Sequence, residues 1–134
     1  MAQLQNDLYK VGYFLSRCCD NTNQAGPSLP PVVLAVRSWS RAYDVFYSQL
    51  SGGKALLSFR NNLKNVRDLF DGHFDNGRVG WMDPSEENPN GRTPRALKGI
   101  AEEVFEKFES LNHEEVWEEV RLLRTSTYLL FHIA

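Results

Sequence analysis

The chain has 134 residues, of which 42% are hydrophobic and 24% are charged, and its formal net charge at pH 7 is −2. This length predicts a single domain, residues 1–134, that buries one core without structural metals or several disulfides. The composition excludes wholesale disorder. A nearly neutral chain also lacks the basic surplus of proteins that bind nucleic acid indiscriminately, so an RNA-binding role requires a local basic ridge.

The two cysteines, Cys18 and Cys19, are adjacent in the sequence. Neighbouring residues of a helix do not easily reach disulfide geometry, so both are expected to be free thiols, which favours a cytoplasmic protein. Arg17 beside Cys18 would lower the pKa of that thiol, but without a histidine partner helix packing is the favoured role. The sequence shows neither a secretion signal nor a stretch long enough to span a membrane, so no membrane contact is expected.

Apolar residues at three- and four-residue steps predict a first helix over residues 2–19 and a second over residues 31–50. Residues 20–30 between them are rich in Asn, Gly, Ser and Pro and are predicted to form a loop. Gly52 and Gly53 end the second helix, and the helical pattern then resumes at once. The second and third helices are therefore expected to form a tight antiparallel pair.

The third predicted helix, residues 54–74, has an apolar stripe that faces the core. Beside this stripe, four charged side chains recur at steps of four, three and four residues: Arg60, Lys64, Arg67 and Asp71. Side chains at these spacings are neighbours on a helix surface. They form a ridge in which three of the four residues are basic.

Residues 75–92 contain two Asn-Gly pairs and two prolines, which exclude a helix and predict a long loop. A short hairpin around Asn76-Gly77 is an open alternative. Loops of this length in compact domains are usually functional or disordered, and Trp81 and Met82 indicate that part of this one packs onto a surface.

Thr93 and Pro94 predict the start of a fourth helix, residues 93–110, as an N-cap followed by proline at the first helical position. Asn112 predicts the start of a fifth helix, residues 113–132, because a glutamate three positions later completes a capping-box pattern. We find no convincing strand and no internal repeat. The expected fold class is all-α: a single-domain bundle of about five helices with one long loop.

Most motifs that carry chemistry are missing from the sequence. It has no glycine-rich phosphate loop, no paired-cysteine zinc half-site and no helical histidine pair with an intervening glutamate. His73 lies between Asp71 and Asp75, but no second histidine is nearby, so neither a metal nor another cofactor is expected. The glutamates of residues 114–119 are typical of a solvated first helical turn, where the helix dipole favours negative charge.

The segment RDLFDGH, residues 67–73, places Arg67 and His73 six positions apart, with the polar Asp68 directly after the arginine. It resembles the R-x(4-6)-H motif of HEPN domains, which are small, mostly α-helical domains of toxin–antitoxin, phage-defence and RNA-processing proteins. The resemblance covers these seven residues and the general architecture. It implies a metal-independent ribonuclease, or its inactive relative, that works as a homodimer with the two motifs facing each other.

Under this hypothesis His73 transfers protons and Arg67 clamps the phosphate, because imidazole titrates near neutral pH and a planar guanidinium matches phosphate oxygens. Asp68 would orient Arg67 or assist RNA contacts, and Arg60 and Lys64 would guide the RNA backbone. On an ideal helix the side chains of Arg67 and His73 point about a third of a turn apart. They converge only through a bend or across a dimer.

A purely structural interpretation competes with the ribonuclease hypothesis. Arg67 can pair with Asp71 four residues further on, which is a favourable spacing on a helix. His73 can close the helix C-terminus, where a partly positive side chain is stabilised.

The alternative function is a non-enzymatic helical binding protein, such as an immunity or antitoxin-like partner or a regulatory interaction module. It would contact a protein partner through residues 75–92. Trp81 and Arg78 are the candidate anchors, because tryptophan, tyrosine and arginine are common at interface hot spots.

Overall fold

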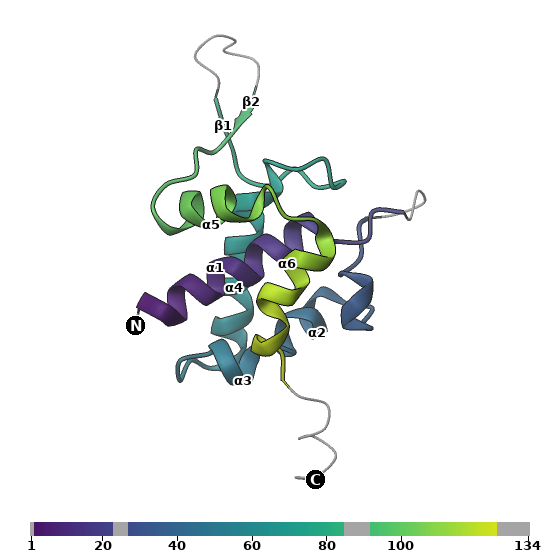
Figure 1. The fold of residues 1–134 in the computed structure, drawn as a ribbon, viewed down its shortest axis with the longest axis vertical. Coiled ribbons are helices and arrows are strands. Elements are labelled where there is room, and N and C mark those ends of the chain that lie inside the picture. The colour runs from purple at the N-terminus through teal and green to yellow at the C-terminus, as the bar shows by residue number, and fades with distance from the viewer. Residues whose placement is uncertain (1, 23–26, 85–91, 126–134) are drawn as a thin grey trace.

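The computed structural model describes residues 2–22, 27–84 and 92–125. In these ranges the chain is mostly helical, as expected, with six α-helices and one small antiparallel sheet. Helix α1 (Ala2–Arg17) lies at the centre and packs extensively on α4 (Leu56–Asp71), while α5 (Ile100–Phe108) and α6 (His113–Val120) also pack on α1 (Figure 1). Every helix within these ranges is too short or too polar to span a lipid bilayer.

The central position of α1 explains why it is buried on more than one face. Residues 11–16 are all buried, whereas the sequence pattern predicted a single apolar stripe. The Tyr13 ring meets four phenylalanine rings edge-on, with centroid separations of 5.3 to 5.8 Å: Phe70, Phe74, Phe105 and Phe108. Such edge-to-face pairs add stability beyond the apolar area that they bury. Tyr13 therefore joins α1 to α4 and α5.

The second predicted helix, residues 31–50, is wrong as a continuous element. It is divided into a 3₁₀ turn η1 (Val32–Leu34), helix α2 (Trp39–Asp44) and helix α3 (Tyr47–Leu50). Ala35 adopts a left-handed conformation with φ of 56°, which ends η1, and the Ser38 side chain accepts a hydrogen bond from the Arg41 backbone N–H and starts α2. Val32, one of the apolar residues whose spacing predicted this helix, is 75% exposed.

The turn after α3 agrees with the prediction. Gly52 and Gly53 have φ values of 58° and 84°, which L side chains rarely adopt, and α4 follows directly. Helix α4 occupies Leu56–Asp71 within the predicted range 54–74, and Gly72 is its C-cap.

The predicted helix start at Thr93 is also wrong. Strand β1 (Met82–Pro84) pairs with strand β2 (Arg92–Pro94) in antiparallel register, with Asp83 opposite Thr93. Proline is compatible with an edge strand because its missing N–H need not face the partner. Helix α5 begins only at Ile100. A hairpin does form, but not around Asn76-Gly77: β1 lies inside the predicted loop, and β2 begins at its last residue and runs on into the predicted fourth helix. The connection between the strands, residues 85–91, lies outside the described residues.

The capping box of the last helix is confirmed. The Asn112 side chain accepts from the Glu115 backbone N–H at 2.8 Å, and the Glu115 carboxylate accepts from the Asn112 backbone N–H at 3.0 Å. Helix α6 ends at Val120, and a 3₁₀ turn η2 (Arg121–Leu123) follows it. The predicted continuation to residue 132 falls largely on residues 126–134, outside the described residues.

The close contact of α1 with α4 gives the first testable prediction. A Cβ atom added at Gly12 would lie 2.3 Å from Val66 Cγ1, which is far inside van der Waals contact. Gly12→Ala gains up to about 1 kcal/mol in helix propensity, but overpacking typically costs about 1 to 3 kcal/mol. We expect a net loss of about 1 kcal/mol in the free energy of unfolding, measured by urea denaturation.

Val66→Ala supplies the control, because it removes the methyl group that the new Cβ would strike. We expect Gly12→Ala to cost less in the Val66→Ala background than in the wild type, with a coupling of about 1 kcal/mol. Additive effects of the two substitutions would contradict this account of the helix contact.

Candidate functional site

The RDLFDGH segment ends α4, and its arginine lies inside the protein. Arg67 is 1% exposed, and its guanidinium carbon lies 4.2 Å from the centroid of the Trp39 ring on α2. Its Nη2 donates to Asp68 Oδ1 at 3.2 Å, and its Nε lies 3.4 Å from Asp71 Oδ2. Among the described residues, Nε and Nη1 have no hydrogen-bond partner. The pairing of Arg67 with Asp71 that the helical spacing allowed is therefore present.

Asp71 is the centre of a buried polar network. It is 1% exposed, and its Oδ1 accepts from the Ser16 hydroxyl at 2.6 Å and from the Asn76 amide at 3.0 Å. Its Oδ2 accepts from Arg78 Nε at 2.9 Å. We call Ser16, Arg67, Asp71, Asn76 and Arg78 the anchor cluster. It joins α1, α4 and the segment that follows α4.

The anchor cluster holds the chain that leads into the hairpin, residues 76–81, which we call the entering limb. Gly80 has φ of 72°, and a Cβ there would lie 2.3 Å from the Gly72 backbone nitrogen and 2.7 Å from the Asp68 carbonyl oxygen. Only glycine fits such a crossing. The Trp81 N–H then donates to the Asp68 carbonyl at 3.1 Å, which satisfies one of the free carbonyls at the end of α4.

His73 holds the chain that leaves the hairpin, residues 95–99, which we call the leaving limb. Its Nε2 lies 2.8 Å from the Arg95 carbonyl oxygen, a geometry in which the imidazole N–H donates. Its ring meets the Phe105 ring of α5 at 5.9 Å. Gly72 keeps a right-handed φ of −65°, and its small size matters because a Cβ would lie 3.1 Å from the Trp81 carbonyl oxygen.

The chain does not bring the two proposed catalytic residues together. Arg67 contacts Trp39, Asp68 and Asp71 in the interior, whereas His73 contacts the leaving limb and α5. Among the described residues, the hydrogen-bonding, ion-pair and ring partners of Arg67 are all different from those of His73. Asp68, the third proposed residue, receives Arg67 and also lies 3.8 Å from Arg78 Nη2.

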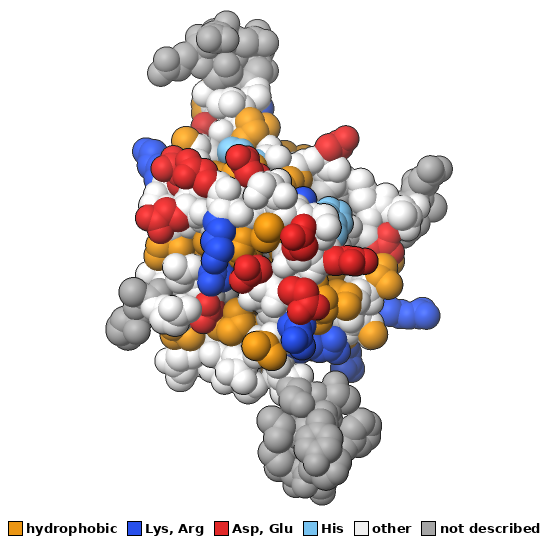
Figure 2. Space-filling model, in the orientation of Figure 1, with side chains coloured by type: hydrophobic (Ala, Val, Ile, Leu, Met, Phe, Trp, Pro, Cys, Tyr) orange, Lys and Arg blue, Asp and Glu red, His pale blue; other side chains and the backbone are white. Residues whose placement is uncertain are grey.

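The two basic residues proposed to guide RNA already have acidic neighbours. Arg60 donates to both carboxylate oxygens of Asp44, at 2.7 and 2.6 Å, and Lys64 Nζ lies 3.9 Å from Asp68 Oδ2. The predicted ridge therefore presents little unpaired positive charge. Figure 2 shows acidic side chains gathered on the face that carries α5 and α6, where the exposed acidic residues are Glu102, Glu103, Glu106, Glu109, Glu114, Glu115, Glu118 and Glu119.

The two proposed partner-binding residues lie at the base of the hairpin. Arg78 has a side chain that is 25% exposed, and its guanidinium bridges the carboxylates of Asp71 and Asp68. Trp81 is half-buried, and the Arg95 guanidinium lies 4.8 Å from the centroid of its ring. Arg95 Nη2 also donates to Asp83 Oδ1 at 3.3 Å, across the strand pair.

The cysteine pair and the acidic residues offer no second site. Burial raises the pKa of the Cys18 thiol to about 12 and outweighs the opposite effect of the Arg17 guanidinium, so packing is its role. Burial raises the pKa of Cys19 as well. Within residues 2–22, 27–84 and 92–125, no three His, Cys, Asp or Glu side chains are grouped closely enough to hold a metal.

Ser16, Trp39 and Asn76 are the members of this site that the sequence did not reveal. Each lies far from Arg67 in the chain or in a predicted loop, and none belongs to a motif. Asn76 had one weak signal, because an Asn-Gly pair places a polar side chain at a turn.

Removing the central charge tests the anchor cluster. Asp71→Asn keeps the size of the side chain but leaves Arg67 without its partner one turn away. Breaking a buried ion pair on one side costs about 3 to 5 kcal/mol. We expect a loss of about 3 kcal/mol in the free energy of unfolding, together with faster amide hydrogen exchange at Trp81.

Asp75→Asn is the matched control, since Asp75 is exposed and close in sequence. A surface substitution of this kind changes stability by about 0.5 kcal/mol at most. If Asp71→Asn and Asp75→Asn had equal effects, the anchor cluster would not stabilise the fold.

Comparisons of the chain with protein-family models, with curated proteins and with solved structures found no match.

Proposed function

We propose that the chain is a non-enzymatic binding module that presents the β1–β2 hairpin to a protein partner. The observation that carries this proposal is that residues of the RDLFDGH segment contact both limbs of the hairpin. Arg67 and Asp71 fix the entering limb through Arg78, and His73 fixes the leaving limb through the Arg95 carbonyl. The residues that could have formed an active site instead hold both ends of one hairpin.

Burial argues against a catalytic role for Arg67 within one chain. A residue that clamps phosphate must reach the substrate, but Arg67 is 1% exposed beneath Trp39. Moving it to the surface would break its contacts with Asp68 and Asp71 and leave the buried Asp71 carboxylate with fewer donors. His73 could act on a substrate only after losing the hydrogen bond to the leaving limb.

The hairpin has the features of a presented recognition element. It stands clear of the helices in Figure 1, while its base is tied to α4. The two strands pair with each other along one edge each, but each also carries a proline, which cannot donate a backbone hydrogen bond to an added strand, so we expect side chains rather than strand addition to contact the partner. Trp81, Arg78 and Arg95 lie at the base and belong to the residue types that dominate interface energies.

Anchoring at both limbs lowers the cost of binding. A free loop loses conformational entropy when a partner orders it, at about 1 to 2 kcal/mol for each backbone residue fixed. The entering limb is already fixed by Gly80 and by the N–H of Trp81 against the end of α4. Contacts made by the hairpin base therefore contribute more of their energy to affinity.

Site-specific photo-crosslinking in the native host cell tests the proposal. A photoreactive residue in place of Asp83, on β1, is expected to give a discrete protein adduct. The same residue in place of Leu57, which is 74% exposed on the first turn of α4, is expected to give none. Trp81→Ala should weaken partner binding about thirtyfold or more, and so largely remove the Asp83 adduct, because a tryptophan hot spot contributes about 2 kcal/mol or more.

The helix content of Trp81→Ala, measured by circular dichroism, must equal that of the wild type, so that a lost adduct reports lost binding and not unfolding. Equal adducts from positions 83 and 57, or none from position 83, would contradict presentation by the hairpin.

An RNA cleavage assay in the presence of a chelator tests the competing ribonuclease hypothesis. We expect the wild type, His73→Ala and the control His113→Ala to leave RNA intact to the same extent as buffer. The reason is that Arg67 and His73 are occupied by separate structural contacts. Cleavage by the wild type and His113→Ala that is lost in His73→Ala would overturn the proposal and restore the ribonuclease hypothesis.

A further inference from the structure

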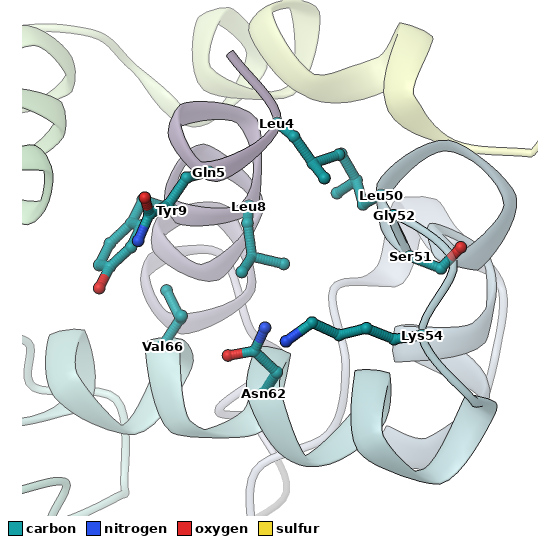
Figure 3. A pocket seen from close by; sticks show the side chains of 10 residues that line it. All are labelled: Leu4, Gln5, Leu8, Tyr9, Leu50, Ser51, Gly52, Lys54, Asn62 and Val66. Carbon is teal, nitrogen blue, oxygen red and sulfur yellow. The ribbon is translucent and has the colours of Figure 1, made fainter. Parts of the chain in front are cut away.

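A pocket of about 420 Å³ opens between α1, α4 and the turn that joins α3 to α4 (Figure 3). Its apolar lining comes from Leu4 and Leu8 of α1, Leu50 of α3 and Val66 of α4. Lys54 and Asn62 supply polar groups at its edge. The volume falls in the range of pockets that bind small molecules, about 300 to 1,000 Å³.

Two close backbone contacts, at Gly12 and at Gly52, bound this pocket. Helices α1 and α4 touch at Gly12 and Val66, and the pocket lies on the N-terminal side of that crossing, where larger side chains separate the helices. At the other end Gly52 closes the pocket, because its Cα approaches Leu4 so closely that a Cβ would lie 2.7 Å from Leu4 Cδ2. The pocket is thus formed by the backbone geometry of three elements.

Lys54 is held in place at its backbone, while its ammonium has no acidic partner among the described residues. The Tyr47 hydroxyl donates to the Lys54 carbonyl at 2.6 Å, and the Lys54 N–H donates to the Ser51 carbonyl at 3.0 Å. In the described part of the chain, no carboxylate lies within ion-pair distance of Lys54, and none lines the pocket. Figure 3 shows the Lys54 and Asn62 side chains pointing toward one another from the turn and from α4.

We propose that this pocket binds a small amphiphilic carboxylate, with its head on Lys54 and Asn62 and its aliphatic chain against Leu4, Leu8 and Leu50. The ammonium and the amide can both donate to one carboxylate, and such charge-assisted bonds are about twice as strong as neutral ones. The leucine side chains bury an aliphatic chain at about 25 cal/mol for each Å² removed from water. This site is separate from the hairpin and does not depend on the function proposed for it.

Three probes distinguish the contribution of the ligand's carboxylate head from that of its aliphatic chain: octanoate below its micelle concentration, acetate and octanol. Titrations followed by ¹H–¹⁵N spectra and by calorimetry are expected to show octanoate binding, with resonance shifts centred on Leu4, Leu8 and Asn62. Acetate should not bind detectably. Octanol should bind more weakly than octanoate.

Lys54→Met keeps the length of the stem and removes the charge. We expect it to weaken octanoate binding about tenfold or more and to leave octanol binding unchanged, since loss of a charged hydrogen bond is the only difference. Lys98→Met, at an exposed lysine outside this pocket, should bind octanoate like the wild type. Failure of octanoate to bind, equal affinity in Lys54→Met, or shifts spread over exposed apolar residues such as Val32 and Leu122 would each overturn the proposal.

Discussion

The structure depends on one buried ion pair, between Arg67 and Asp71 on the last turns of α4. Moving such charges out of water costs several kcal/mol for each ion, so both must be compensated inside the protein. Asp71 accepts three hydrogen bonds, from Ser16, Asn76 and Arg78, and the guanidinium of Arg67 lies on the Trp39 ring. These compensating groups come from α1, α2 and the entering limb, so the charge pair requires the three segments to meet at one place.

This requirement links the helical core to the hairpin. The Tyr13 ring packs with Phe70 one residue before Asp71, and Ser16 binds Asp71 itself, so α1 fixes the end of α4 by apolar and polar contacts together. The entering limb then crosses that end at Gly80 with no room for a side chain. A limb fixed in this way has already lost much of its conformational entropy, which supports the proposal that the hairpin base is presented to a partner.

The sequence predicted the elements that local patterns control and missed those that tertiary contacts control. The α1 and α4 helices have strong apolar periodicity and were located well, and the local Asn112 capping box located the start of α6 but not its end at Val120. Residues 31–50 have the same periodicity, but the left-handed Ala35 and the Ser38 cap interrupt the helix. Nothing in a three- and four-residue spacing distinguishes a continuous helix from one that is restarted by a serine.

The Thr93-Pro94 dipeptide also predicted the wrong element, because a local signal for a helix start is compatible with a strand. A threonine followed by proline suits an N-cap and the first helical position, but threonine is also β-branched and proline is tolerated on an edge strand. The choice was decided by Asp83 and Met82, which lie opposite Thr93 and Pro94 in the hairpin. That pairing spans residues 84 to 92 and is not encoded in the dipeptide.

The role of Arg67 and His73 was the hardest feature to predict from the sequence. A catalytic site and a structural contact at the hairpin base require the same types of residue. A phosphate clamp and a partner for a buried carboxylate both need the planar fork of arginine, and a proton carrier and a helix-end donor both suit histidine. What distinguishes the two roles is exposure, and the exposure of Arg67 is set by Trp39, 28 positions earlier in the chain. A seven-residue motif cannot contain that information. The residues that decide its role lie on another helix, whose position follows only from the packed fold.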